Sequence, residues 1–128
     1  MPTLQQDFDV LSQLFQSSED AVVVCNTEEE IILFNTAASH LYGQAKSIRL
    51  ADCPAMFGMR TPDGKRLLSK EELPMYRALH GEDVRGFDLV LSDRQHGTRH
   101  MRVDAYPVRR DGGIVGAVVR SRPACRER

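Results

Sequence analysis

The stretch EIILFNTAASHLYG, from Glu30 to Gly43, changes from a strand-like to a helix-like pattern within a few residues. Its first part is continuously apolar and ends at Phe34. Asn35 follows, and asparagine is strongly favoured at a helix N-cap because its side-chain oxygen accepts a hydrogen bond from an amide of the first turn. Gly43 suits the left-handed residue that closes a helix. The pattern predicts a strand that leads directly into a helix over residues 36–42.

This predicted helix is too short to be stable alone. It has barely two turns, and isolated helices of that length are marginal in water. Ala38, Leu41 and Tyr42 recur at helical spacing and supply one apolar face. We therefore expect the helix to fold back and pack on a sheet that contains the preceding strand.

Two further helices are predicted on either side of this corner. Near the N-terminus, apolar residues recur every three or four positions, the period of an amphipathic helix; they are Leu4, Phe8, Leu11 and Phe15. In the stretch SKEELPMYRALHG (69–81), Ser69 and Glu72 form a capping box, while Pro74 suits a first helical position. Either signal can begin this second helix, whose apolar face then carries Leu73, Tyr76 and Leu79 or His80.

Five segments have the composition of strands. They are AVVVCN (21–26), IILFN (31–35), GFDLVL (86–91), RHMRVDAYPV (99–108) and GIVGAVV (113–119). Gly97 and the run Asp111-Gly112-Gly113 mark hairpin turns between the last three. Strands joined by hairpins and followed or preceded by helices are typical of an α+β domain. We expect a five-stranded antiparallel sheet with short helices on one face and an N-terminal flanking helix.

The last strands also predict which side chains face the helices. Successive side chains of a strand point to opposite faces, so apolar residues two positions apart share one face. The face covered by helices should carry Phe87, Leu89, Leu91, Met101, Val103 and Ala105. The opposite face should carry Asp88, Val90 and Ser92.

Composition points to one ordinary globular domain. The chain has 128 residues, 41% of them hydrophobic and 27% charged. A domain of this size buries enough surface to be stable without disulfide bonds or structural metal ions. No apolar run approaches the roughly 18 residues of a membrane span. Cys25, Cys53 and Cys125 form no CxxC pair. We therefore expect reduced thiols and a cytoplasmic location, with no membrane contact.

The charges are unevenly distributed, but they do not favour a nucleic-acid partner. Residues 1–93 carry 8 basic and 15 acidic side chains, and residues 94–128 carry 9 and 3. Only Tyr106 stands among the C-terminal arginines as an aromatic platform on which a base could stack. Strand arginines that face solvent or pair with acidic residues explain the same pattern.

The motifs of common enzymes and metal sites are missing from the sequence. It has no phosphate-binding glycine loop, no nucleophile elbow and no zinc-spaced set of cysteines and histidines. His96 and His100 have the spacing of a ligand pair on a helix, but they flank a predicted turn. We predict a protein that is not an enzyme and holds no metal.

Four stretches in order resemble the PAS family of sensory domains, over about residues 8–120. They are SSEDAVVVCN, IILFNTAASHLYG, EELPMYRALHGEDVRGFDLVL and HGTRHMRVDAYPVRRDGGIVGAVV. The resemblance implies a flanking helix over residues 1–18, a PAS domain over 19–121 and a basic tail over 122–128. It also implies a bacterial module of signal transduction, as in two-component signalling, whose helices roof a small cavity.

The resemblance assigns roles to particular residues. A ligand cavity would be lined by Tyr42, Met56, Phe57, Tyr76, Leu79, His80, Phe87, Leu89, Met101 and Val103. In related domains the flanking helix packs at a two-fold axis, which places Leu4, Phe8, Leu11 and Phe15 in a homodimer interface. The alternative is a pure interaction and dimerisation module whose core is filled by its own side chains.

Two cofactors need separate consideration. In haem-binding members the axial histidine comes from the helix that ends at His80 or from just after it, which makes a haem-based gas or redox sensor a further alternative. Cys53 lies near the position of the photoreactive cysteine of light-sensing members. The surrounding sequence, LADCPAMFG, lacks the polar residues that hold flavin in those light-sensing members, so a structural cysteine is the favoured interpretation.

Overall fold

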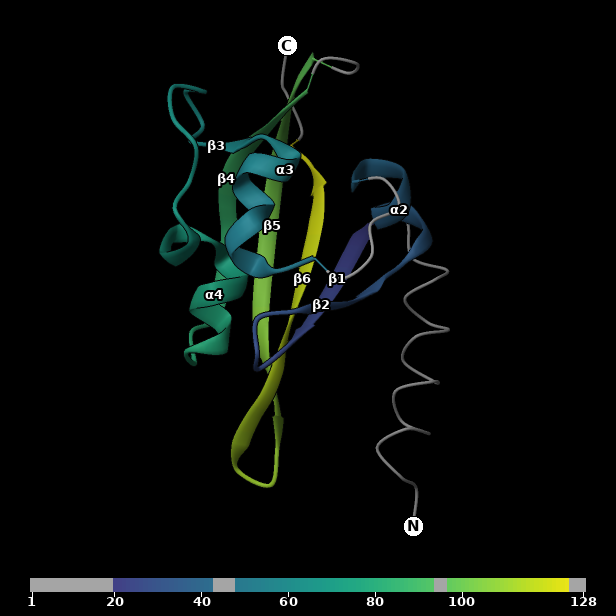
Figure 1. Ribbon diagram of the computed structural model, residues 1–128, viewed down its shortest axis with the longest axis vertical. Helices are drawn as coiled ribbons and strands as arrows, with labels where there is room; N and C mark the ends of the chain where they lie inside the picture. The colour runs from purple at the N-terminus through teal and green to yellow at the C-terminus, as the bar shows by residue number, and fades with distance from the viewer. Residues whose placement is uncertain (1–19, 43–47, 94–96, 125–128) are drawn as a thin grey trace.

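A single antiparallel sheet organises the molecule (Figure 1). This computed structural model describes residues 20–42, 48–93 and 97–124. Over these ranges the sheet has six strands in the order β2-β1-β6-β5-β4-β3. Their bounds are β1 (Ala21–Asn26), β2 (Ile31–Phe34), β3 (Met59–Arg60), β4 (Val84–Asp93), β5 (Gly97–Arg110) and β6 (Gly113–Pro123). The α+β class and all five predicted strands are confirmed.

The sixth strand, β3, is the difference from the predicted sheet. It has two residues, and Met59 and Arg60 pair with Leu91 and Val90 of β4. Two residues cannot display an alternating pattern, so only the tertiary pairing reveals this edge strand. The last strand is also longer than predicted, since β6 continues to Pro123.

The helical segments are short and pack on one face of the sheet (Figure 1). They are α2 (Thr36–Tyr42), η1 (Leu50–Asp52), α3 (Cys53–Phe57), η2 (Lys70–Glu72) and α4 (Pro74–Leu79). Both predicted start signals are used, because the capping box of Ser69 and Glu72 begins η2 and Pro74 is the first residue of α4. The predicted bounds of α2 are confirmed.

The predicted alternation of β4 and β5 is confirmed. Leu89, Leu91, Met101, Val103 and Ala105 are buried in the core between sheet and helices, and Phe87 is half-buried against it. On the opposite face Asp88 is exposed, whereas Val90 is buried between Arg60 of β3 and His100 of β5.

The β5–β6 hairpin closes with a two-residue turn. Arg110 pairs with Gly113, and the two residues between them, Asp111 and Gly112, have φ angles of 52° and 81°. Positive φ at both positions is the geometry of a type I′ turn, which matches the twist of the flanking strands. The turn predicted at residues 111–113 is therefore confirmed.

Some predictions fall outside the described residues. They concern the N-terminal helix with Leu4, Phe8, Leu11 and Phe15, and the end of the basic tail. In the part of the chain that the structure describes, no helix is both long and apolar enough to cross a membrane.

Candidate functional site

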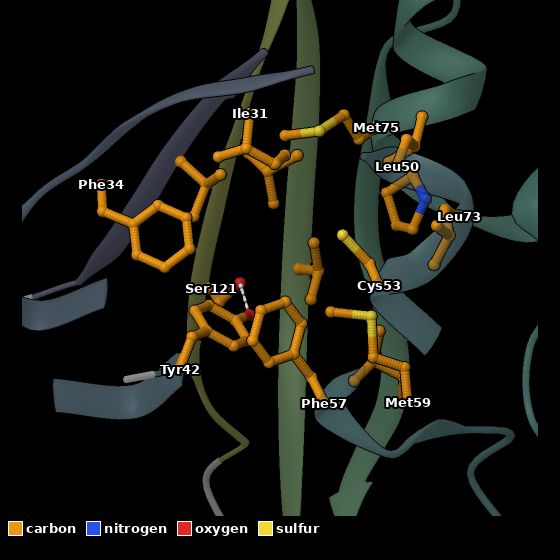
Figure 2. A pocket seen from close by; sticks show the side chains of 15 residues that line it. Ile31, Phe34, Tyr42, Leu50, Cys53, Phe57, Met59, Leu73, Met75 and Ser121 are labelled. Carbon is orange, nitrogen blue, oxygen red and sulfur yellow. Dashed lines mark hydrogen bonds between the residues drawn. The ribbon is translucent and has the colours of Figure 1, made fainter. Parts of the chain in front are cut away.

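A small apolar cavity lies between the sheet and its helical roof (Figure 2). Its volume is about 50 Å³. The lining residues come from β3, from the other five strands of the sheet and from the helical roof; they are Val23, Ile31, Phe34, Tyr42, Leu50, Cys53, Phe57, Met59, Leu73, Pro74, Met75, Leu89, Val103, Val119 and Ser121. None of these side chains is charged, and the polar groups among them are two hydroxyls and one thiol.

Asn35 fixes the position of α2 above this cavity. Its side chain is fully buried. The side-chain oxygen Oδ1 accepts hydrogen bonds from the amides of Ala38, at 2.8 Å, and Val22, at 2.9 Å, and Nδ2 donates to the Asp20 carbonyl at 2.9 Å. Asn35 therefore caps the helix as predicted and also ties it to strand β1.

Tyr42 ends α2 and projects into the cavity. Its ring lies 5.9 Å from that of Phe34 and 4.9 Å from that of Phe57, measured between centroids. Its hydroxyl shares a hydrogen bond of 3.2 Å with Ser121 Oγ, drawn as the dashed line in Figure 2. Burial raises the pKa of the Tyr42 phenol, while the bond to Ser121 and the positive charge of Arg99 partly oppose that rise. The phenol is therefore neutral at physiological pH and can donate or accept one hydrogen bond.

Burial keeps the cavity thiol of Cys53 in its protonated form. Cys53 Sγ donates a weak hydrogen bond to the Arg49 carbonyl at 3.6 Å. Burial raises the pKa of Cys53 to about 12 and that of Cys25, deeper in the core, to about 11. Because the thiolate is the nucleophilic and metal-binding form, neither cysteine suits those roles at neutral pH. Among the described residues, no group of three or more candidate ligands could hold a metal ion.

The structure brings four of the ten predicted ligand-binding residues to this cavity: Tyr42, Phe57, Leu89 and Val103. The other six do not line it. Met101 lines a neighbouring cleft, Phe87 lines a groove between the start of β4 and the side of η2 and α4, and Met56 is 54% exposed.

The α4 residues of the predicted set do not line the cavity, although Tyr76 and Leu79 pack against the core. Pro74, Met75 and Ala78 are its buried residues, whereas Tyr76 and Leu79 are half-buried at its side. The preceding 3₁₀ turn η2 places Leu73 and the first helical turn over the cavity, and this changes which side chains point inward.

His80 does not fit the role of an axial ligand for a haem in this cavity. It is exposed, and its Nδ1 atom lies 2.9 Å from the Tyr76 carbonyl oxygen. Its ring stacks on the Tyr76 ring with centroids 4.3 Å apart. The side chain therefore packs back along α4, away from the residues that line the cavity.

Several lining residues were missed by the sequence analysis although a signal existed. Extending the alternation of β6 from Val119 places Ser121 on the inner face. The same step back from Met101 places Arg99 on this face near the start of β5, where it lines a neighbouring cleft and not the cavity. Ile31 and Phe34 were harder to assign, because β2 is continuously apolar and a bulge shifts its register.

A second space adjoins the cavity on the far side of Ser121. This cleft has a volume of about 310 Å³ and is open to solvent. It is lined by Ala21, Ala37, His40, Leu41, Arg99, Met101, Ser121 and Pro123. Its charged and ionisable groups, Arg99 and His40, distinguish it from the uncharged cavity.

The opposite face of the sheet carries a buried carboxylate. Asp104 is 5% exposed and accepts hydrogen bonds from the Gly86 amide and Arg120 Nη2, both at 2.8 Å, and from Arg122 at 3.4 Å. Burial alone would raise the pKa of Asp104, but these three partners outweigh it and hold the pKa below its usual value. This group stabilises the sheet and does not contribute to the cavity.

Solved structures with the same architecture support the assignment of the fold. The PAS domain of a protein from Colwellia psychrerythraea has a TM-score of 0.63 and 17% identity, covering 92% of this chain and 97% of that chain. The PAS domain of an HTR-like protein from Haloarcula marismortui has a TM-score of 0.59 and 17% identity, covering 94% and 100%. The phage VqmA–DPO complex has a TM-score of 0.64 and 15% identity, covering 93% and 53%.

Sequence comparison gives the family directly. No curated protein matches the chain significantly. The family model of the PAS fold matches residues 15–128, which is most of the chain and includes every strand and helix described above. The chain belongs to the PAS fold family.

Proposed function

We propose that this domain is a non-enzymatic sensory module of a signal-transduction protein and that its roofed cavity binds a small, mainly apolar molecule. The observation that carries the proposal is the apolar cavity between the sheet and several separate short helices. Structural relatives include a PAS domain from a two-component sensor histidine kinase and a domain of a sensory box sensor histidine kinase/response regulator from Geobacter sulfurreducens. The phage relative was solved as a complex with DPO.

The chemistry of the cavity supports binding rather than catalysis. General acid–base catalysis requires a titratable group whose pKa lies near the working pH. Tyr42 and Cys53 both have raised pKa values, and the described residues of the lining include no histidine or carboxylate. Such a site favours recognition by shape and apolar contact.

The volume favours a second candidate function. A drug-sized ligand occupies roughly 300 Å³ or more, whereas the cavity measures about 50 Å³ and has room for a few water molecules. A domain whose core is filled by its own side chains would act only through dimerisation and partner contacts. The two candidates differ in whether the roof opens for a ligand.

Dimerisation through the N-terminal helix is part of the proposal. The sheet face opposite the helices carries apolar side chains on β1 and its two neighbours: Val22, Val24, Leu33 and Val118. An apolar sheet face of this kind requires cover. The stripe of Leu4, Phe8, Leu11 and Phe15 would supply it within an isologous dimer.

Native mass spectrometry of freshly purified protein tests the function directly, because it reports bound small molecules and oligomeric state together. We expect a small molecule to co-purify with the wild-type protein. We also expect this molecule to be absent when a cavity residue is substituted. A ligand-free dimer that also fails to bind added small apolar molecules would favour the filled-core candidate.

The dimer is tested by Phe8→Glu combined with Leu11→Glu and light scattering at matched concentration. We expect the double variant to be a folded monomer. A wild-type protein that is already monomeric at tens of micromolar would contradict the dimer.

A further inference from the structure

We propose that Tyr42 and Ser121 form a gate between the cavity and the adjoining cleft, and that the ligand is a small amphipathic carboxylate. Its apolar end would enter the cavity and its carboxylate would remain in the cleft beside Arg99. This inference rests on the proposed ligand-binding function and adds the route of entry and the chemical class of the ligand.

The gate is defined by the residues that separate the two spaces. Ser121 lines both of them and is only 2% exposed. Leu41 and Tyr42 are neighbours at the end of α2, yet Leu41 lines the cleft and Tyr42 lines the cavity. The hydrogen bond of 3.2 Å between Tyr42 and Ser121 is the polar contact that crosses this wall. Rotation of the Tyr42 side chain would therefore connect the two spaces.

The two spaces have complementary chemistry. The cavity contains aromatic rings, aliphatic chains and sulfur atoms, so it accepts an uncharged group. The cleft contains the half-buried guanidinium of Arg99 and the imidazole of His40. The positive charge of Arg99 is close enough to Tyr42 to lower the pKa of its phenol. A molecule that bridges both spaces must be apolar at one end and anionic at the other.

Arg99 can bind a carboxylate in addition to the contacts that it already makes. Its Nη2 atom donates to the Leu41 carbonyl at 3.5 Å, which orients the side chain along the cleft toward α2. A guanidinium carries five N–H donors and binds carboxylates in a planar, often bidentate arrangement, so it can contact a backbone carbonyl and an anion together. Arg99 also continues the inward register of Met101, which brings a charge to the end of the apolar face.

The volumes agree with this division of the ligand. The cavity alone, at about 50 Å³, holds only a short apolar group, whereas the cleft measures about 310 Å³. The cleft alone already reaches the roughly 300 Å³ of ordinary small-molecule sites, so the cavity needs to hold only the apolar end of the ligand. Burial of each further methylene should raise affinity about fourfold until the cavity is full.

The experiment titrates wild-type protein with acetate, butyrate, hexanoate and hexan-1-ol while amide and methyl NMR spectra are recorded. We expect affinity to rise about sixteenfold from butyrate to hexanoate, which has two more methylenes. Hexanoate should shift the resonances of both cavity and cleft residues and should bind at least about fivefold more tightly than hexan-1-ol.

Two variants with matched controls assign the two ends of the ligand. Arg99→Gln should lower the affinity for hexanoate to that for hexan-1-ol and leave hexan-1-ol unaffected, whereas Arg102→Gln, on the other face of the same strand, should change neither. Tyr42→Phe should speed association of hexanoate several-fold, whereas Tyr76→Phe, outside the cavity, should not.

Each contrary result identifies what is wrong. Equal binding of hexanoate and hexan-1-ol in the cavity would overturn the carboxylate site and leave the proposed ligand-binding function intact. Equal binding of acetate and hexanoate, with shifts confined to the cleft, would overturn entry through the gate. Absence of binding by all four probes, in wild type and in Tyr42→Phe alike, would overturn both this inference and the proposed function.

Discussion

The two ends of α2 are held in very different ways. At its start, Asn35 is fully buried and makes three hydrogen bonds to backbone groups on β1, on the helix and at Asp20. At its end, Tyr42 crosses to the sheet with one hydrogen bond between two side chains. The first end is bonded to atoms whose positions the backbone fixes, while the second is bonded to a hydroxyl that can rotate.

This difference suggests how a short helix can be both anchored and adjustable. Leaving a buried amide without a partner costs about 1–3 kcal/mol, so movement at Asn35 would be expensive. Breaking one neutral bond between hydroxyls costs about 0.5–1.5 kcal/mol. A change in ligand occupancy is therefore expected to move the Tyr42 end, with Asn35 as the fixed point.

The largest loss of stability is expected at Leu89, which lies on the sheet and forms part of the floor of the cavity. Leu89→Ala should lower the free energy of unfolding by about 2–5 kcal/mol, because the truncation adds empty volume to a site that is already hollow. Chemical denaturation measures this, with Leu67→Ala as the control, since Leu67 is 39% exposed. Similar losses in the two variants would show that Leu89 is not part of the packed floor.

The fixed end of α2 is tested by Asn35→Ala. We expect a loss of about 2–4 kcal/mol, more than the roughly 0.5–2 kcal/mol of an ordinary N-cap, because two amides and a carbonyl lose their partner. Asn26→Ala is the matched comparison. Its Oδ1 also accepts two amides, from Glu28 and Glu30, but in a more exposed turn where water can replace it. Equal midpoints of denaturation for the two variants would contradict the special role of burial at Asn35.

Asp104 is another buried polar group, and its contribution to stability depends on pH. Asp104→Asn should cost about 1–3 kcal/mol at neutral pH, since it weakens the bonds from Arg120 and Arg122. The pKa of Asp104 is lowered by folding, so its contribution is complete above the usual value of 3.8 and is lost as the pH falls through the folded-state value. The stability difference between wild type and variant, measured by denaturation across that range, should shrink as acid is added. A difference that is constant with pH would rule out the charge as its source.

The smallest effect on stability is expected at the adjustable end. Tyr42→Phe should cost only about 0.5–1.5 kcal/mol, because the ring keeps its contacts with Phe34 and Phe57 while the bond to Ser121 is lost. Hydrogen exchange should show faster opening at the end of α2 than at its start. If both ends of the helix were equally destabilised, the two ends would not be independent.

The cavity shows where sequence reasoning reaches its limit. The alternation of β4 and β5 predicted the inward positions of Leu89 and Val103, because a strand has a fixed period of two. The predicted face of α4 is confirmed only in part, since Tyr76 and Leu79 pack against the core while Met75 lines the cavity. A helix of six residues has too few turns for its periodicity to define a face, and the preceding 3₁₀ turn sets its rotation.

Local signals in the sequence determined the elements and their ends. Asn35, the box of Ser69 and Glu72, and the turn at Asp111 and Gly112 act through bonds to nearby backbone or through allowed φ angles, and these depend little on the rest of the molecule. Tertiary structure decided how large the cavity is, which residues line it, and that Ser121 meets Tyr42 from 79 positions away. Those features depend on packing between distant segments, where a shift of one residue or a small helix rotation changes every contact.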